Sequence, residues 1–243
     1  MSKSEVIVIT GANGHLGKYL VNSLANSYSV ISITRDQISE RIHENNFHIK
    51  ADLSIKSELV KIKESIKSIC KSKNLSLHGL VNNAFWTGEI ERPESCSDSY
   101  QGVFRSHVDL TLLLLPLIKN GGSVVNISSM YANVAPKPSN YNSENQINPL
   151  EYGAMKAALQ SATRWMSAMY CKTKGVRFNS ISFGPFPSLG NQNNEFNLKL
   201  SDSTHIGRIG QPHEAVGPVM FLLSANSSYM TGSNIAVDGG WTA

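Results

Sequence analysis

The chain contains few cysteines and no long apolar run, and these two shortages exclude several classes of protein. Among its 243 residues there are three cysteines, Cys70, Cys96 and Cys171, and they lie far apart. This spacing fits neither a disulfide-rich scaffold nor a zinc site, so we expect reduced structural thiols and no metal. The strongest apolar run, LTLLLLPLI at 110–118, is too short to span a bilayer and is interrupted by Pro116.

Charge and targeting signals are also scarce. Charged residues make up 16% of the chain, the formal net charge is +4, and the basic residues are dispersed. Nucleic-acid binding is therefore a weak hypothesis, and a small anionic ligand explains the charge equally well. The start, MSKSEVIVIT, has a four-residue apolar stretch that does not fit a signal peptide. We expect a cytoplasmic protein without a membrane segment.

Apolar runs alternate with helix-period stretches along the whole chain. The runs expected to form strands are 5–10, 29–34, 77–84, 122–129, 175–182 and 233–238. Helices are expected between the first two strands and near 54–73, 97–119, 150–174 and 212–225. Because parallel strands need crossover connections, this order predicts an α/β fold with a doubly wound parallel sheet and helices on both faces. We expect one domain over residues 1–243.

A glycine-rich turn, TGANGHLG at 10–17, directly follows the first expected strand and opens the first helix. Glycines allow a tight turn and a close approach of the backbone to a diphosphate, whose charge is favoured at a helix N-terminus. Such a turn is weak evidence alone, but its position in an alternating chain favours dinucleotide binding over a plain turn.

The end of the second expected strand bears on which dinucleotide is bound. It reads SITRD, so Thr34 stands where an acidic residue would hold the ribose hydroxyls of NAD, and Arg35 follows. An arginine there accommodates the 2′-phosphate of NADP. NADP(H) is therefore favoured over NAD(H), although Asp36 keeps NAD open.

A tyrosine and a lysine four residues apart form a candidate proton-transfer pair. In EYGAMKAAL at 151–159, Tyr152 and Lys156 lie on one helix face, where an ammonium favours ionisation of a phenol. Tyr170 and Lys174 have the same spacing, so the pair alone is not specific.

In their order along the chain, these motifs resemble those of the short-chain dehydrogenase/reductase family. The resemblance runs from residue 6 to residue 242 and favours Tyr152 over Tyr170. It rests on TGANGHLG, on ADL at 51–53, VNNA at 81–84, NISS at 126–129, YGAMK at 152–156, RFNSISFGP at 177–185, GRIGQPHE at 207–214 and TGSNIAVDGGW at 231–241. It implies a Rossmann-like domain that binds NAD(P), interconverts small-molecule alcohols and ketones, and forms homodimers or homotetramers.

The resemblance also implies roles for single residues. Tyr152 would exchange a proton with the substrate oxygen, Lys156 would lower the pKa of that tyrosine and hold the nicotinamide ribose, and Ser129 would hydrogen-bond the substrate. Ser128 is expected to be structural, because side chains alternate along a strand. Asp52 would meet the adenine. The other implied cofactor contacts are Gly11, Asn13, His15, Leu16, Gly17, Arg35, Leu53, Asn83, Ala84, Pro185 and Phe186.

Aromatic and imidazole side chains replace family glycines and prolines at several places. His15 stands where glycine is usual, Phe85 and Trp86 follow VNNA, and Phe183 with Gly184 replaces a Pro-Gly pair. The aromatic residues are equally compatible with pocket walls and with core packing.

The asparagine that usually joins the catalytic set is missing. Its place falls on Val103 without a gap and on His107 with one, so no residue is assigned to that role. Ser129 and Tyr152 are separated by 23 positions, which is longer than usual, and the polar insert at 135–151 is expected to be a surface loop near the substrate mouth.

These features resemble a subgroup linked to flagellin modification and surface-sugar synthesis, which points to a sugar or nucleotide-sugar substrate. Two alternatives stay open: a 3-oxoacyl-thioester reductase of the same family, and a cofactor-binding scaffold with little catalysis.

Overall fold

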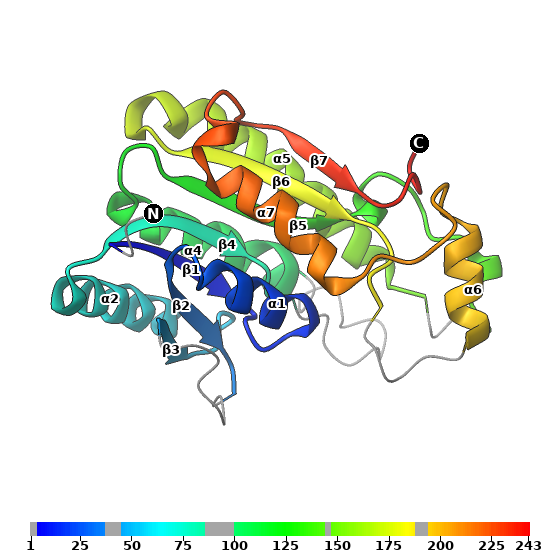
Figure 1. Ribbon diagram of the computed structural model, residues 1–243, viewed down its shortest axis with the longest axis horizontal. Coiled ribbons are helices and arrows are strands. Elements are labelled where there is room, and N and C mark those ends of the chain that lie inside the picture. The colour runs from blue at the N-terminus through cyan, green and yellow to red at the C-terminus, as the bar shows by residue number, and fades with distance from the viewer. Residues whose placement is uncertain (1–3, 37–44, 86–99, 144–146, 188–193) are drawn as a thin grey trace.

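A seven-stranded parallel sheet forms the centre of the protein (Figure 1). The computed structural model describes residues 4–36, 45–85, 100–143, 147–187 and 194–243. In spatial order the strands are β3 (Asn46–Lys50), β2 (Ser29–Thr34), β1 (Glu5–Thr10), β4 (Ser76–Asn82), β5 (Ser123–Ser129), β6 (Arg177–Phe183) and β7 (Asn234–Val237). The order reverses between β1 and β4, so the predicted doubly wound sheet is confirmed.

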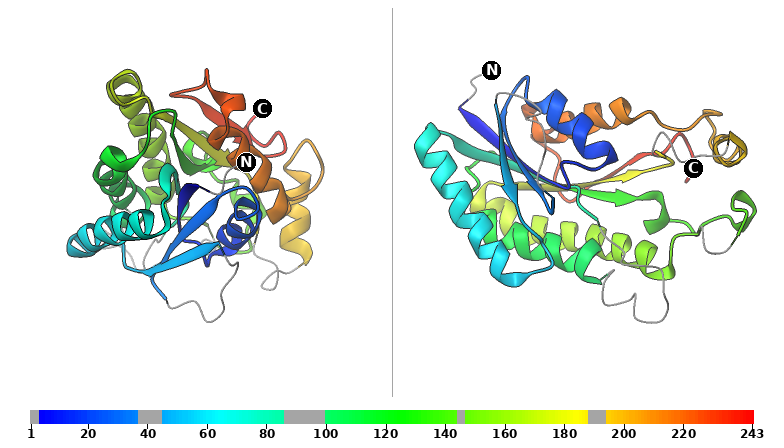
Figure 2. Two further views of the ribbon diagram at one scale, coloured as in Figure 1. Left: turned by 60° about the vertical axis from the view of Figure 1, so that its left-hand side comes forward. Right: turned by 90° about the horizontal axis from the view of Figure 1, so that it is seen from below.

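Two layers of helices cover the sheet (Figure 2). On one face, α1 (His15–Leu24) and α7 (Val216–Leu223) pack against the inner strands. On the other face lie α2 (Lys56–Lys73), α4 (Ser106–Leu114) and α5 (Leu150–Lys174). Because both faces are covered, β2 and β6 are buried throughout and read as continuous runs in the sequence. No helix in the described part of the chain has the length and apolar character to cross a membrane.

Three elements differ from the predicted ones. The edge strand β3 was missed, because its partly exposed sequence NFHIK carries no apolar run. The short helix α6 (Asn194–Asp202) was missed too, since NEFNLKLSD is mostly polar. The helix expected near 97–119 is described from Tyr100 and is divided into a π-helical turn, η1 (Tyr100–Arg105), then α4, then the 3-10 turn η2 (Leu115–Leu117).

Short 3-10 turns complete the fold: η3 (Met130–Ala132), η4 (Pro138–Asn140), η6 (Pro212–Ala215) and η7 (Ala225–Ser227). The helix predicted over 212–225 thus begins as η6, where Gln211 and Glu214 form a capping box, and continues as α7. Cys70 and Cys171 are free thiols, as expected, and Cys96 lies outside the described residues.

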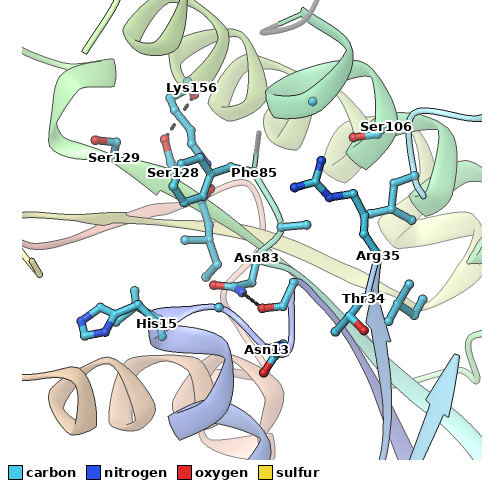
Figure 3. A pocket seen from close by; sticks show the side chains of 18 of the residues that line it. Asn13, His15, Thr34, Arg35, Asn83, Phe85, Ser106, Ser128, Ser129 and Lys156 are labelled. Carbon is cyan, nitrogen blue, oxygen red and sulfur yellow. Dashed lines mark hydrogen bonds between the residues drawn. The ribbon is translucent and has the colours of Figure 1, made fainter. Parts of the chain in front are cut away.

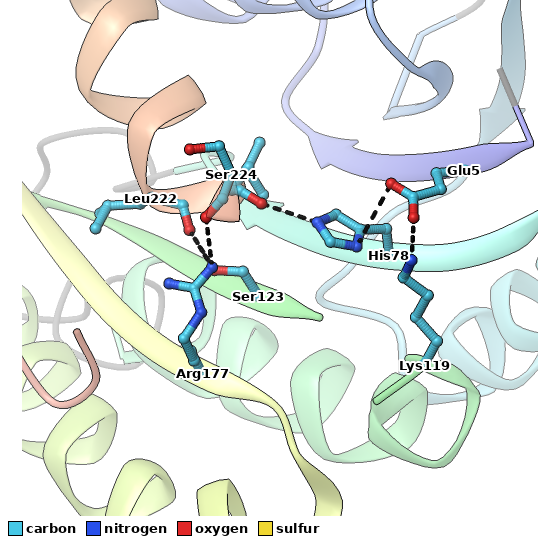
Figure 4. Close-up of polar contacts among 8 residues, drawn as sticks. Glu5, His78, Lys119, Ser123, Arg177, Leu222 and Ser224 are labelled. Atoms are coloured by element: carbon cyan, nitrogen blue, oxygen red, sulfur yellow. Dashed lines mark hydrogen bonds and ion pairs between the residues drawn. The ribbon is translucent and has the colours of Figure 1, made fainter. Parts of the chain in front are cut away.

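Side chains from the central strands hold the C-terminal end of α7 (Figure 4). Arg177 on β6 donates from Nη2 to the carbonyl oxygens of Leu222 and Ser224, at 2.9 and 3.1 Å. Ser123 on β5 donates to the Leu222 carbonyl at 2.7 Å, and Nε2 of His78 on β4 lies 2.8 Å from the next carbonyl oxygen of the helix. The last carbonyls of a helix lack intrahelical partners, so these bonds fix α7 on the sheet.

Candidate active site

A cavity of about 500 Å³ opens at the carboxyl ends of the parallel strands, where the strand order reverses. Ligands of doubly wound sheets bind at this position, because the loops that leave neighbouring strands diverge there. The cavity extends from the glycine turn and the end of β2 to β5 and the start of α5 (Figure 3).

The glycine turn has a backbone that side chains would obstruct. Gly11 has a φ of 63°, and a Cβ atom there would lie 2.7 Å from the Cα atom of Ala84. At Gly17 a Cβ atom would lie 2.2 Å from the carbonyl oxygen of Gly11. Gly11 therefore allows the turn to approach β4, and Gly17 allows α1 to pack on the turn.

Hydrogen bonds tie the glycine turn to the end of β4. The Thr10 hydroxyl accepts the backbone N–H groups of Asn83 and Ala84, both at 3.0 Å. The side-chain amide of Asn83 donates to the carbonyl oxygens of Thr10 and Gly11, at 3.0 and 3.1 Å. The expected role of Asn83 beside the cofactor is thus accompanied by a structural one.

Polar side chains line the cavity at the end of β2 and beyond β3. Arg35 extends toward the cavity in Figure 3. The Thr34 hydroxyl donates to the backbone carbonyl of Asp36 at 2.6 Å and also lies 2.7 Å from Nε2 of His48. The carboxylate of Asp52 accepts hydrogen bonds from the backbone and hydroxyl of Ser54, at 2.8 and 2.7 Å.

At the other end of the cavity, β5 and α5 bring Ser129, Tyr152 and Lys156 together. Lys156 is 2% exposed, and its ammonium donates to the carbonyl oxygen of Ile127 at 2.7 Å. Burial disfavours the charge and lowers the pKa of Lys156 to about 7. Burial raises the pKa of Tyr152, and a hydrogen bond with Ser129 partly offsets this rise. The lowering by Lys156 that the resemblance implied is therefore not the dominant effect on this phenol.

The two alternatives for the missing asparagine differ in their surroundings. Val103 is fully buried in η1 and is not among the residues that line the cavity. His107 is 1% exposed, and its pKa is lowered to about 3 by burial and, to a smaller extent, by the charge of Lys156. His107 is thus the alternative that lies within electrostatic reach of the lysine, as a neutral imidazole.

Phe85 and Phe183 line the cavity, so at these positions the pocket-wall alternative holds, while Trp86 lies outside the described residues. Phe85 is 61% exposed, whereas Phe183 is buried and also packs in the core. The second pair, Tyr170 and Lys174, is not part of the cavity; the ring of Tyr170 packs against Trp165 and Phe178.

Most residues expected at the site line the cavity: Gly11, Asn13, His15, Leu16, Arg35, Asp52, Leu53, Asn83, Ala84, Ser129, Tyr152, Lys156 and Phe186. Gly17 and Pro185 do not line it; the Pro185 carbonyl accepts the N–H of Gly210 at 2.9 Å. Ser128 also lines it, with its hydroxyl donating to the Lys156 carbonyl at 3.2 Å.

Sequence reasoning missed Gly102 and Ser106, which also line the cavity. They reach it because η1 has a wider helical turn than the α-helix expected there, and the sequence carries no signal for this change.

A cavity at the strand-order reversal, with a glycine turn on one side and a Ser-Tyr-Lys set on the other, defines a nucleotide-dependent oxidoreductase as the class to compare. Residues 28–242 match the family model described as "Enoyl-(Acyl carrier protein) reductase". Two similar curated proteins are the L-xylulose reductase of Caenorhabditis elegans, 29% identical over 97% of this chain and 95% of the relative, and the post-translational flagellin modification protein A of Campylobacter coli, 24% identical over 99% of each.

A solved structure of a short-chain dehydrogenase from Leptospira borgpetersenii with bound NAD+ is also similar. It has a TM-score of 0.81 and 28% identity, and covers 99% of this chain and 94% of that chain. The chain belongs to the short-chain dehydrogenase/reductase family and is an oxidoreductase, as the motifs predicted. The description of the family model names one reaction, but a sugar reductase matches over nearly the whole chain, so that description does not fix the substrate.

Burial of Lys156 predicts a pH-dependent cost to stability. Its pKa of about 7 lies below the ordinary value of 10.5, so the unfolded chain binds more protons between these pH values. Stability from this group therefore rises with pH across that window. We expect Lys156→Met to raise the free energy of unfolding by about 2 kcal/mol more at pH 6 than at pH 9, measured by urea denaturation.

Lys172→Met, at an exposed position on the same helix, is the matched control. An equal gain for Lys156→Met at both pH values would contradict the burial cost.

Proposed function

We propose that this oxidoreductase uses NADP(H) in preference to NAD(H) and interconverts a secondary alcohol and a ketone on a sugar or nucleotide-sugar. The observation that carries the proposal is the single cavity lining shared by the glycine turn, Arg35 and the Ser129-Tyr152-Lys156 set. One dinucleotide bound along this lining would reach from the end of β2 to the catalytic residues.

The residues present fit such a cofactor. Backbone from Gly11 to Leu16 at the start of α1 would hold the diphosphate, and the first turn of α1 contains no acidic residue that would repel it. Asp52 and Leu53 would meet the adenosine, with Asn83 and Ala84 beside it. Tyr152 and Lys156 would hold the nicotinamide ribose.

The preference for NADP(H) rests on the end of β2. Arg35 extends toward the cavity, and Thr34 has no carboxylate to bind ribose hydroxyls. A guanidinium pairs with a phosphate through charge-assisted hydrogen bonds. The Leptospira relative carries NAD+, so Arg35 itself is the support for NADP(H) here.

The catalytic set supplies proton transfer and charge stabilisation. The bound nicotinamide supplies or accepts the hydride. Reduction of a ketone leaves negative charge on its oxygen, which Tyr152 protonates while Ser129 donates a second hydrogen bond. The ammonium of Lys156 favours the phenolate in the reverse direction, and its pKa near 7 allows its charge to change around neutral pH.

A hydroxylated substrate is supported by the insert between Ser129 and Tyr152. This segment is more than an exposed loop, because it packs against α6. The ring of Tyr141 lies 5.6 Å from that of Phe196, and the hydroxyls of Tyr141 and Tyr131 are 2.5 Å apart. Aromatic rings with amide groups nearby suit sugars, and the names of the xylulose reductase and the flagellin modification protein agree with this class.

Cofactor preference is tested by titrating the purified protein with NADPH and NADH and following fluorescence. We expect NADPH to bind more tightly, and Arg35→Ala to weaken NADPH binding about tenfold while changing NADH binding little, since one charge-assisted contact is lost. Arg164→Ala, at an exposed position on α5, is the control. Equal losses for both cofactors would contradict the assigned role of Arg35, and absence of binding would contradict the dinucleotide site.

Catalysis is tested with a panel of ketoses, polyols and nucleotide-sugars, with an acetoacetyl thioester as the rival substrate. Tyr152→Phe should lower turnover at least about 100-fold, because the proton donor is lost, and leave NADPH affinity within about threefold. Turnover that survives this substitution would contradict the mechanism. Thioester reduction without sugar turnover would favour the acyl-thioester reductase, and wild-type binding without any turnover would favour the scaffold.

A further inference from the structure

The side chain of Phe85 lies at the cavity although no hydrophobic core requires it there. The apolar residues of β4, Leu77, Leu80 and Val81, are buried, whereas Phe85, just beyond this strand, is 61% exposed. Large exposed aromatic rings in a cavity are contact surfaces rather than core. In Figure 3 the ring lies beside the side chain of Lys156.

The contacts of this ring are with the catalytic pair. Its centroid lies 6.0 Å from that of Tyr152, at an interplanar angle of 65°. The Nζ atom of Lys156 lies 5.8 Å from the centroid of Phe85 and 5.8 Å from that of Tyr152. Both distances are within the range of a cation–π interaction, so two rings flank the ammonium.

The charged groups around Lys156 do not compensate its charge. Among the described residues, none of the ion pairs within 4.0 Å includes Lys156. The titratable groups near it are Tyr152 on its own helix, His107 on α4 and, beyond Tyr152, Tyr131 of η3. His107 is neutral near pH 7, and burial raises the pKa of both tyrosines, so none of these groups supplies a negative charge there.

We propose that Phe85 is a positioning residue for Lys156: the negative potential of its ring face stabilises the buried ammonium, and its exposed side forms the wall of the cavity. The ring takes the place that a carboxylate fills in a buried ion pair. It therefore keeps a larger fraction of Lys156 charged near neutral pH, which is the form that favours the Tyr152 phenolate. The importance of this effect for catalysis rests on the proposed function, but its effect on Lys156 does not.

The direct test is an NMR titration of protein labelled with [13Cε]lysine, which needs neither cofactor nor substrate. The signal of Lys156 is assigned by its loss in Lys156→Met. Phe85→Leu retains an apolar side chain but removes the ring, so we expect the midpoint of Lys156 to fall by about one pH unit. Phe85→Trp retains a π face and should keep the midpoint within about 0.3 unit of the wild type.

Phe221→Leu on α7 is the matched control, since this residue is 37% exposed and lies outside the cavity lining. It should leave the midpoint of Lys156 unchanged. An unchanged midpoint in Phe85→Leu would overturn the proposal, and a raised midpoint would do so too, because it would show that the ring acts by excluding water. Circular dichroism checks folding, and Phe85→Met replaces Phe85→Leu if the latter does not fold.

A second readout links the interaction to catalysis. With a substrate identified from the panel, Phe85→Leu should move the Lys156-dependent limb of the kcat–pH profile down by about the same one unit, and Phe85→Trp should restore it. A merely structural role would lower kcat without moving this limb. If the wild type binds neither NADPH nor NADH, the proposed function fails, while the NMR midpoints still decide the role of Phe85.

Discussion

The junction between the ends of β1 and β4 determines the geometry of the site. Thr10 accepts two backbone N–H groups from Asn83 and Ala84, and Asn83 returns two hydrogen bonds to Thr10 and Gly11. This close approach needs a residue without a side chain at Gly11. Because the strand order reverses here, the same junction sets how far the glycine turn lies from Phe85, the first residue beyond it to face the catalytic pair.

Burial and partner groups compete at Lys156. The residue is held by one carbonyl oxygen and flanked by two aromatic rings, and burial still lowers its pKa to about 7. Its position follows from α5, which places it one turn after Tyr152. Close packing of this helix needs Gly153, where a Cβ atom would lie 2.6 Å from the carbonyl oxygen of Tyr131. The backbone thus fixes both the place and the charge balance of the pair.

The sequence predicted the sheet because its inner strands are covered on both faces and leave continuous apolar runs. The same reasoning failed at β3, which is a partly exposed edge strand, and at the polar helix α6. It could not reveal that η1 is wider than an α-helix and brings Ser106 to the cavity. Motifs predicted which residues gather there but not their tasks: Gly17 supports the turn, and Phe85 contacts the lysine rather than the core.

The central claim is that one dinucleotide lies along the cavity from Arg35 to Tyr152. A crystal structure of the protein with NADPH tests it most directly. The account predicts the 2′-phosphate at Arg35, the diphosphate at the backbone of Gly11 to Leu16, and the nicotinamide between Ser129, Tyr152 and Lys156. A cofactor bound elsewhere, or in this cavity with the nicotinamide remote from Tyr152, would contradict it.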